Sequence, residues 1–312
     1  MLISKNFRVD TLACFPDVTR LAEHLFLINA PNSARFPFCN AFLVTGDETV
    51  LIDTGIGKNR LREIDATVRI DRVIISHPHP DHICGYEVLQ DRALTVPFET
   101  SEAIHDLIDL GTRFTGTVEL GRYWARFARV IGVVPMKPPD SRFRHGDILD
   151  FGAVRLEAIR VPGHIDDHYC FLEHHSRTLL TTDVDFSAFG PWYGNPESAI
   201  RPFQEGVEML RQIPCELVCS SHKPPIEGSA ATDDAFREFL EGFDRHRDRV
   251  LALCDIPKTL AEMTAASPFY NDKMPDKSIQ NLFERMMIQK NLDLLVEDGM
   301  VGGADGRYFR VD

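Results

Sequence analysis

The sequence lacks any long apolar run, because its longest apolar stretches are shorter than ten residues, whereas crossing a bilayer takes about 20. It is also short of basic residues, with 34 Lys and Arg against 47 Asp and Glu and a net charge of −13. Such a surface repels nucleic acid and anionic membranes. The first 15 residues contain no apolar signal core or cleavage site. These absences predict a cytoplasmic protein without a membrane partner. They also make nucleic acid an unfavourable binding partner.

Cysteines are few, odd in number and scattered, with seven in 312 residues. Disulfide frameworks use even numbers of cysteines in short secreted chains, so we expect free thiols in a reducing compartment. Cys215 and Cys219 lie four positions apart and form no Cys-x-x-Cys pair. Hydrophobic residues make up 44% and charged residues 26%, a globular balance that excludes collagen-like and wholly disordered chains.

Residues 20–225 alternate β-rich runs with turns and helical patterns. Residues 40–55 form an expected hairpin around Gly46 and Asp47. Further strands are expected at 72–76, 147–151, 154–161, 168–172, 178–182 and 216–220, and helices near 58–66, 82–90, 101–110, 119–130 and 197–212. Two strand-rich halves separated by a helical insertion predict an α/β fold with two packed sheets and helices outside.

The pattern changes after residue 230, so we divide the chain into a catalytic domain, 1–230, and a C-terminal module, 231–312. A charged helix at 235–254, helices at 260–266 and 278–297, and a hairpin at 299–311 outline a winged helix. Residues 236–312 contain 11 Lys and Arg against 14 Asp and Glu, which does not favour DNA binding. We therefore expect a packing module or a homodimer contact.

Three histidines and an aspartate gather in the segment His77-Pro-His-Pro-Asp-His82. The prolines hold His77 and His79 extended, so that both imidazoles point to the same side. Asp81 and His82 then begin a helix and can face a neighbouring point. This spacing predicts two metal positions, and imidazole with carboxylate suits Zn²⁺, with iron or manganese as alternatives.

Three further candidates each follow a strand that runs into a turn. They are His164 after Val161-Pro-Gly, Asp183 after Thr181-Thr, and His222 after Ser220-Ser. Each alone is equally consistent with a surface histidine or a turn-capping aspartate. Beside the six-residue cluster, all three become candidate metal ligands.

These motifs, with Asp53 in Leu51-Ile-Asp-Thr-Gly55, resemble the metallo-β-lactamase superfamily in order across residues 20–225. The resemblance implies an αββα sandwich with the site at one edge, between the sheets. It implies a first metal on His77, His79 and His164, a second on Asp81, His82 and His222, a bridging Asp183, and Asp53 hydrogen-bonded to a ligand or site loop. Pro162-Gly-His-Ile-Asp-Asp-His168 and the C-terminal module resemble the lactamase-β-2-type hydrolases.

The sequence departs from the family pattern near the ligands. Cys84 and Thr182 stand where glycines are expected, and Ser221 and Lys223 flank the last histidine. No ligand is lost, but the shape of the cleft is affected. An aromatic stretch follows Asp183, and its side chains are candidates for an apolar pocket wall or for a core plug: Phe186, Phe189, Trp192 and Tyr193.

The resemblance implies hydrolysis by a hydroxide that bridges two metals, with Asp81 orienting it or taking its proton. No acid for a poor leaving group is evident; His168 is the best candidate, although it could equally be a buried strand histidine. We therefore favour a small acyl thioester, lactone or activated ester over a β-lactam. A single-strand endoribonuclease, a signalling effector acting through a partner surface, and iron-dependent redox chemistry stay open.

Overall fold

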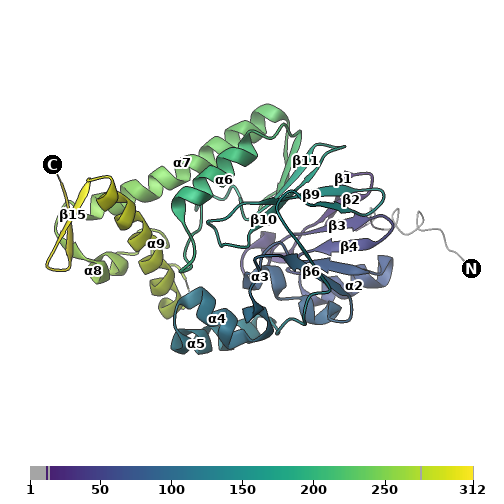
Figure 1. Ribbon diagram of the computed structural model, residues 1–312, viewed down its shortest axis with the longest axis horizontal. Helices are drawn as coiled ribbons and strands as arrows, with labels where there is room; N and C mark the ends of the chain where they lie inside the picture. Colours follow the sequence, from purple (N-terminus) through teal and green to yellow (C-terminus); the bar gives the residue numbers. More distant parts are fainter. Residues whose placement is uncertain (1–11, 13–14, 275, 312) are drawn as a thin grey trace, which may run out of the picture.

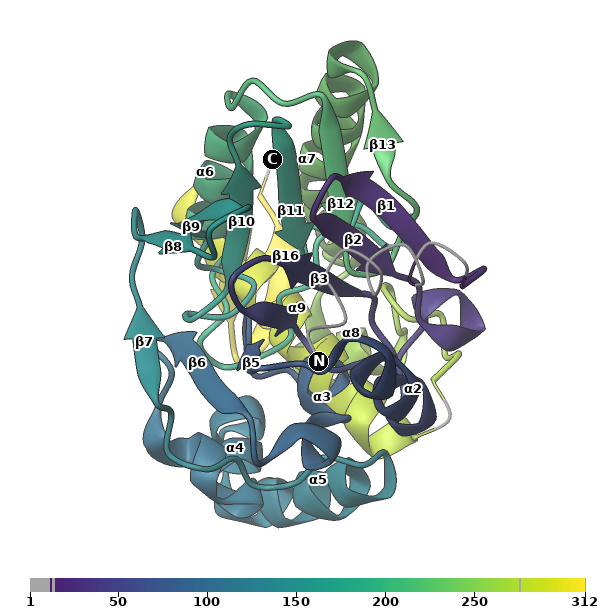
Figure 2. The ribbon, with the colours of Figure 1, turned by 90° about the vertical axis from the view of Figure 1, so that its right-hand side faces the viewer.

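The computed structural model describes Leu12, residues 15–274 and residues 276–311. Two β-sheets lie face to face with helices on their outer sides (Figures 1 and 2). The first has seven strands in chain order: β1 (Val18–Ala22), β2 (Leu25–Ile28), β3 (Ala41–Thr45), β4 (Thr49–Ile52), β5 (Arg72–Ile74), β6 (Ala93–Pro97) and β7 (Ser141–Phe143). The second has the order β13 (Ile226–Glu227), β12 (Leu217–Ser220), β11 (Thr178–Thr182), β10 (Tyr169–Glu173), β9 (Arg155–Arg160) and β8 (Ile148–Asp150).

An apolar layer fills the space between the sheets. Phe42 and Ile52 from the first sheet meet Phe171 and Leu180 from the second, and all four are fully buried. Every residue of β3, β4, β10 and β11 is buried because helices cover the outer faces. The predicted arrangement of two packed sheets within outer helices is confirmed.

Each outer face has its own helices. The first sheet is covered by α2 (Lys58–Val68), α4 (Leu107–Thr115) and α5 (Val118–Val130), and the second by α6 (Ile200–Arg211) and α7 (Ser229–Leu253). On α4, Leu107, Leu110 and Phe114 recur at helical spacing and are buried in the first cluster.

Two expected helices are interrupted. Residues 82–90 form a short α3 (Pro80–Ile83) and a 3₁₀ turn, η2 (Tyr86–Leu89). Gly85 separates them, and a Cβ there would lie 2.2 Å from the carbonyl oxygen of Thr54. The stretch 101–110 also divides, because Asp106 ends a 3₁₀ turn, η3 (Glu102–His105), and caps α4.

Parallel pairing directs several strand ends to the same edge. β4 runs parallel to β5, and β11 runs parallel to β12. β9 and β11 both pair antiparallel with β10, so they share a direction. Side chains that follow these strands therefore gather at the carboxyl edge, where α/β sheets commonly bind ligands.

The C-terminal segment adds a small three-stranded sheet and two helices. Its elements are β14 (Lys258–Thr259), α8 (Leu260–Ala265), α9 (Lys277–Glu297), β15 (Val301–Ala304) and β16 (Arg307–Arg310). In Figure 1, α9 runs from the α7 side toward α4 and α5. Met287 and Leu292 of α9 share a buried cluster with Phe243 of α7. The division at residue 230 and the homodimer stay predictions.

Two predictions rest on what the sequence lacks, namely paired cysteines and long apolar runs, and the described residues bear on both. Six cysteines lie there and all are unpaired, as predicted; all six are also buried, and Cys14 lies outside the described part. Within the same part, no helix combines the length and hydropathy that a membrane span requires.

Candidate metal centre

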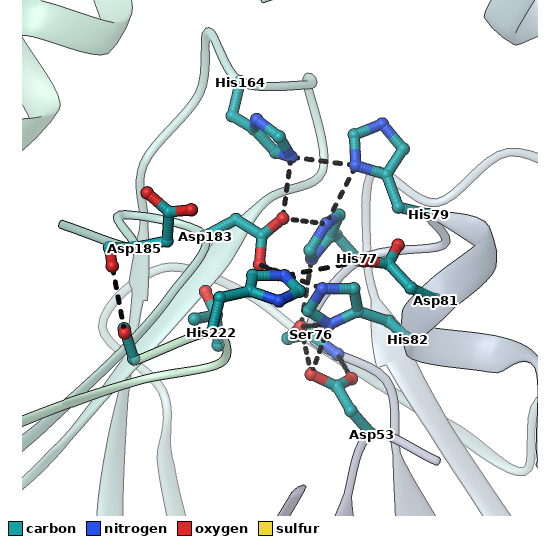
Figure 3. Close-up of polar contacts among 12 residues, drawn as sticks. Asp53, Ser76, His77, His79, Asp81, His82, His164, Asp183, Asp185 and His222 are labelled. Carbon is teal, nitrogen blue, oxygen red and sulfur yellow. Dashed lines mark hydrogen bonds and ion pairs between the residues drawn. The ribbon is translucent and has the colours of Figure 1, made fainter. Parts of the chain in front are cut away.

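All seven predicted ligand side chains converge at the carboxyl edge of the two sheets (Figure 3). The loop from β5 into α3 brings His77, His79, Asp81 and His82. Pro80 opens α3 as its first residue, and His79 before it is extended, as the prolines predicted. The other three follow β9, β11 and β12: His164, Asp183 and His222.

The first group contains three imidazoles and one carboxylate oxygen. Nδ1 of His79 lies 3.0 Å from Nε2 of His77 and 2.8 Å from Nε2 of His164. Oδ2 of Asp183 lies 3.5 Å from Nε2 of His77 and 3.3 Å from Nε2 of His164. Four potential ligand atoms therefore face one point.

The second group shares the same aspartate. Oδ1 of Asp183 lies 2.9 Å from Nε2 of His82 and 3.4 Å from Nε2 of His222. Oδ2 of Asp81 lies 3.5 Å from Nε2 of His222. Asp183 thus turns one carboxylate oxygen toward each group.

Two polar atoms of this centre form no hydrogen bond. Among the described residues, Nε2 of His82 and Oδ1 of Asp183 are buried and lie 2.9 Å apart without one, and a buried polar group without a hydrogen bond costs about 1–3 kcal/mol. A divalent cation would satisfy both atoms, since imidazole nitrogen and carboxylate oxygen are its ligands. The cluster is therefore chemically able to hold metal.

The ligand histidines differ in the direction in which their pKa is shifted. Burial lowers the pKa of His77 and His79 well below the usual value, so both rings are neutral and offer lone pairs. Against the effect of burial, the Asp183 carboxylate raises the pKa of His222 to about 9. A bound cation would displace that proton, so metal binding releases protons here.

Each ligand ring uses its other nitrogen in a contact that fixes its orientation. The partners are Asn195 Oδ1 for His79 (2.7 Å), the Trp192 carbonyl for His164 (2.9 Å), the Ala34 carbonyl for His222 (2.7 Å), Ser76 Oγ for His77 (3.1 Å) and Asp53 Oδ2 for His82 (2.8 Å). Of these, only the Asp53 contact was expected from the sequence.

Asp53 holds the loop as well as the ligand. Its Oδ1 accepts the Ser76 backbone N–H at 2.8 Å, and its Oδ2 accepts the Ser76 hydroxyl at 2.7 Å. Its φ is 64°, in the left-handed region that Asp and Asn tolerate better than most residues. The strained backbone directs a fully buried carboxylate at His82.

Comparisons with known proteins match residues 34–222 to the Metallo-beta-lactamase superfamily. This chain belongs to that superfamily. The Lactamase-like protein nscB of Trichophyton rubrum is 24% identical over 96% of this chain and 87% of its own. A metallo-beta-lactamase family protein from Thermus thermophilus has the same fold, with a TM-score of 0.72 and 22% identity over 94% of this chain and 100% of its own. Hydroxyacylglutathione hydrolase of Francisella philomiragia is 26% identical over 39% of this chain and 36% of its own.

Thr182 stands directly before Asp183, where the resemblance predicts a glycine. Its φ is 46°, a conformation that glycine adopts without strain. Its Oγ1 lies 2.7 Å from Nε2 of His168 and 2.9 Å from the Tyr169 carbonyl. These contacts hold the residue that places Asp183.

His168 is a positioning residue in this member of the superfamily. Its Nδ1 lies 2.9 Å from the Val161 carbonyl, and its Nε2 accepts the Asp183 backbone N–H at 3.2 Å. The ring is fully buried, and burial lowers its pKa to about 3. Both nitrogens are engaged, an arrangement that favours a positioning role over the role of acid for a leaving group, which stays a prediction.

A cavity of about 710 Å³ opens beside the cluster, and its lining corrects the expected pocket. Phe189 and Trp192 line it, as predicted. Phe186 and Tyr193 do not: Phe186 packs on Phe236 of α7, and Tyr193 is fully buried against Phe243. Tyr193 is therefore a core residue and Phe186 a partly buried residue packed against the core, because α7 covers that side of the loop.

Most of the apolar wall was absent from the predicted site. It comes from the 33–36 segment, from α4 and α5, and from the C-terminal segment: Phe36, Phe114, Trp124, Phe127, Tyr270, Met274, Ile279 and Phe283. A pattern of apolar residues in a helix cannot distinguish a cavity wall from a core face.

Proposed function

We propose that this protein is a dinuclear metal-dependent hydrolase that cleaves an acyl thioester, a lactone or an activated ester. The observation that carries the proposal is the orientation of Asp183. Its Oδ2 faces His77 and His164, whereas its Oδ1 faces His82. A carboxylate between two sets of imidazoles suits a bridge between two cations.

The residue roles follow from the two groups. His77, His79 and His164 hold the first ion; Asp81, His82 and His222 hold the second; and Asp183 joins them. The ions are Zn²⁺, with iron or manganese as alternatives. When bound, such a pair supplies hydroxide near neutral pH and polarises the carbonyl that is attacked.

Asp81 is the residue that handles the proton. It lines the cavity, and its Oδ2 is directed at the second group, 3.5 Å from His222 Nε2. A carboxylate at this position can orient the attacking oxygen and accept its proton. His79 and His164 line the same cavity, so substrate reaches both groups from one side.

The lack of an acid from His168 favours substrates with good leaving groups. A thiolate or an enolate departs without a proton, whereas an amine or a ribose alkoxide needs one. The name of the Francisella relative, hydroxyacylglutathione hydrolase, agrees with a thioester. The narrower likeness to lactamase-β-2-type hydrolases stays a prediction.

The test combines elemental analysis with a substrate panel of an aryl thioester, a γ-lactone, a nitrophenyl ester and single-stranded RNA. We expect close to two metal ions per chain and turnover of at least one acyl substrate. Asp81→Asn should keep most of the metal and lose turnover by several orders of magnitude. Asp166→Asn, an exposed change on the His164 loop, is the matched control.

Other outcomes distinguish the alternatives. Comparable turnover by Asp81→Asn would remove this residue from the mechanism. Cleavage of RNA alone would favour the endoribonuclease. A fully loaded protein that is inactive on the whole panel would favour the signalling role.

A further inference from the structure

The cavity has two walls of different chemistry. The polar wall holds His79, Asp81, His164, Asp183 and His222 of the metal centre. The apolar wall includes two aromatic pairs: Phe36 stacks on Phe127 with ring centroids 5.9 Å apart, and Trp192 meets Phe283 at 5.1 Å. A volume of about 710 Å³ is within the range of sites that enclose small ligands.

Trp192 joins these walls. Its carbonyl lies 2.9 Å from Nδ1 of His164, and its ring centroid lies 5.3 Å from that of His79. Its indole N–H donates to the Tyr270 hydroxyl at 2.5 Å. A group bound against Trp192 and Phe283 therefore lies beside the first group of histidines.

Three cations line the same cavity, and none of them has a partner in the part of the chain that the structure describes. They are Arg35 in the segment after η1 (Pro31–Ala34), Lys223 after the last histidine, and Lys273 before α9. None of the three side chains makes an ion pair or hydrogen bond with any described residue. Most cations elsewhere, such as Arg60 with Asp17 and Arg72 with Glu48, are paired.

The negative and positive side chains occupy different parts of the cavity lining. Of its carboxylates, Asp81 and Asp183 belong to the metal cluster, and Asp185 lies beside it in Figure 3. The cations come instead from three separate chain segments, in a protein whose net charge is −13. Unpaired cations in a cleft attract an anion and raise its local concentration.

We propose that the substrate is an anionic aryl or similarly apolar acyl compound, with its apolar group on the aromatic wall and its anion held by Arg35, Lys223 and Lys273. This inference rests on the proposed function for the site of bond cleavage. It adds a recognition site outside the metal centre, to which the C-terminal segment contributes Lys273 and Phe283. Salt should weaken the recognition of the anion more than that of the apolar group.

The experiment measures binding separately from turnover. Zinc-loaded Asp81→Asn protein is titrated with three naphthoyl thioesters: a neutral one on N-acetylcysteamine, one with a carboxylate on the thiol, and one with a carboxylate on the ring. Trp124 and Trp192 are the two tryptophans of the chain, and both line the cavity, so quenching of their fluorescence reports occupancy.

We expect at least one anionic ester to bind tenfold or more tightly than the neutral ester at low salt. The Lys223→Gln/Lys273→Gln double substitution should reduce that ratio below threefold. Arg122→Gln removes an exposed cation of α5 that does not line the cavity and should leave the ratio unchanged. The position of the favoured carboxylate shows which half of the substrate bears the anion.

Equal binding of neutral and anionic esters, or a ratio that survives the double lysine substitution, would overturn the inference. Turnover of the same esters by the unmodified protein decides the proposed function separately. An anion preference in binding without turnover would leave the recognition site standing and remove the hydrolase. Turnover of these esters without a preference for the anionic ones in binding would leave the hydrolase standing and remove the recognition site.

Discussion

Nε2 of His79 donates to Oδ1 of Asn195, 2.7 Å away, and this bond determines which ring nitrogen faces the metal centre. With the proton on Nε2, the lone pair is on Nδ1, which lies 2.8 Å from Nε2 of His164. The Asn195 amide donates in turn to the Phe114 carbonyl at 2.9 Å. The Asn195 side chain is therefore held at both its oxygen and its nitrogen, and it fixes the orientation of the His79 ring.

Asn195→Ala should weaken metal binding by about 10–100-fold, because His79 loses the partner that orients it. Competition with a chromogenic zinc chelator measures the affinity. Asn59→Ala, an exposed substitution in α2, should have no effect. Unchanged affinity in the Asn195 variant would show that packing alone orients the ring.

Asp53→Asn should release the second ion and retain the first. Asparagine tolerates the positive φ, so the backbone stays, but the anionic acceptor that faces His82 Nδ1 at 2.8 Å is lost. We expect one ion per chain at a zinc concentration that gives two in the unmodified protein. Elemental analysis after gel filtration gives the count, and loss of both ions or of neither would contradict this role.

Arg113→Met should destabilise the fold by about 3–5 kcal/mol, because it leaves Asp167 buried without its partner. Arg113 contacts the two Asp167 oxygens at 3.1 and 2.6 Å and also bonds Glu197 at 2.7 Å. Urea unfolding measures the loss. The matched control is Arg177→Met, whose pair with Glu216 is about half exposed and contributes about 0–1 kcal/mol.

Because of His246, the free energy of unfolding should decrease in mild acid. The His246 ring is buried, with Nε2 2.8 Å from the Phe189 carbonyl and Nδ1 3.1 Å from the Tyr193 hydroxyl. Burial, aided by Arg249 and Arg245, lowers its pKa to about 4. The unfolded chain binds this proton near pH 6.5 and the folded chain only near 4, so stability is complete above 6.5 and declines as pH falls.

The comparison is between the unmodified protein and His246→Gln, which keeps hydrogen-bonding atoms but does not titrate. Between pH 7.5 and 5.0 the unmodified protein should lose about 2 kcal/mol more of its free energy of unfolding than the variant. Urea midpoints at both pH values measure this difference. The other histidines titrate in both proteins, so their contributions cancel in the comparison. Parallel declines in the two proteins would assign no acid sensitivity to His246.

Interactions between distant residues explain where the structure differs from the pattern of the sequence. The expected helix at 82–90 is interrupted because Gly85 approaches the Thr54 backbone, a contact that local spacing does not contain. Strand β6 was not predicted, although it pairs in parallel with β5. Phe186 and Tyr193 were placed beside the substrate because they are near Asp183 in the chain, but α7 covers them.

The sequence by itself determined the seven ligand candidates and the two-sheet arrangement. Proline stiffness and strand alternation act over two or three residues, so the segment 77–82 already directs its side chains. Only the tertiary structure decided that Asn195 and the Trp192 carbonyl orient the ligands, and that Phe36 and Phe283 share one cavity. Those contacts join residues up to about 250 positions apart, and burial against such distant partners leaves no periodic signal in the chain.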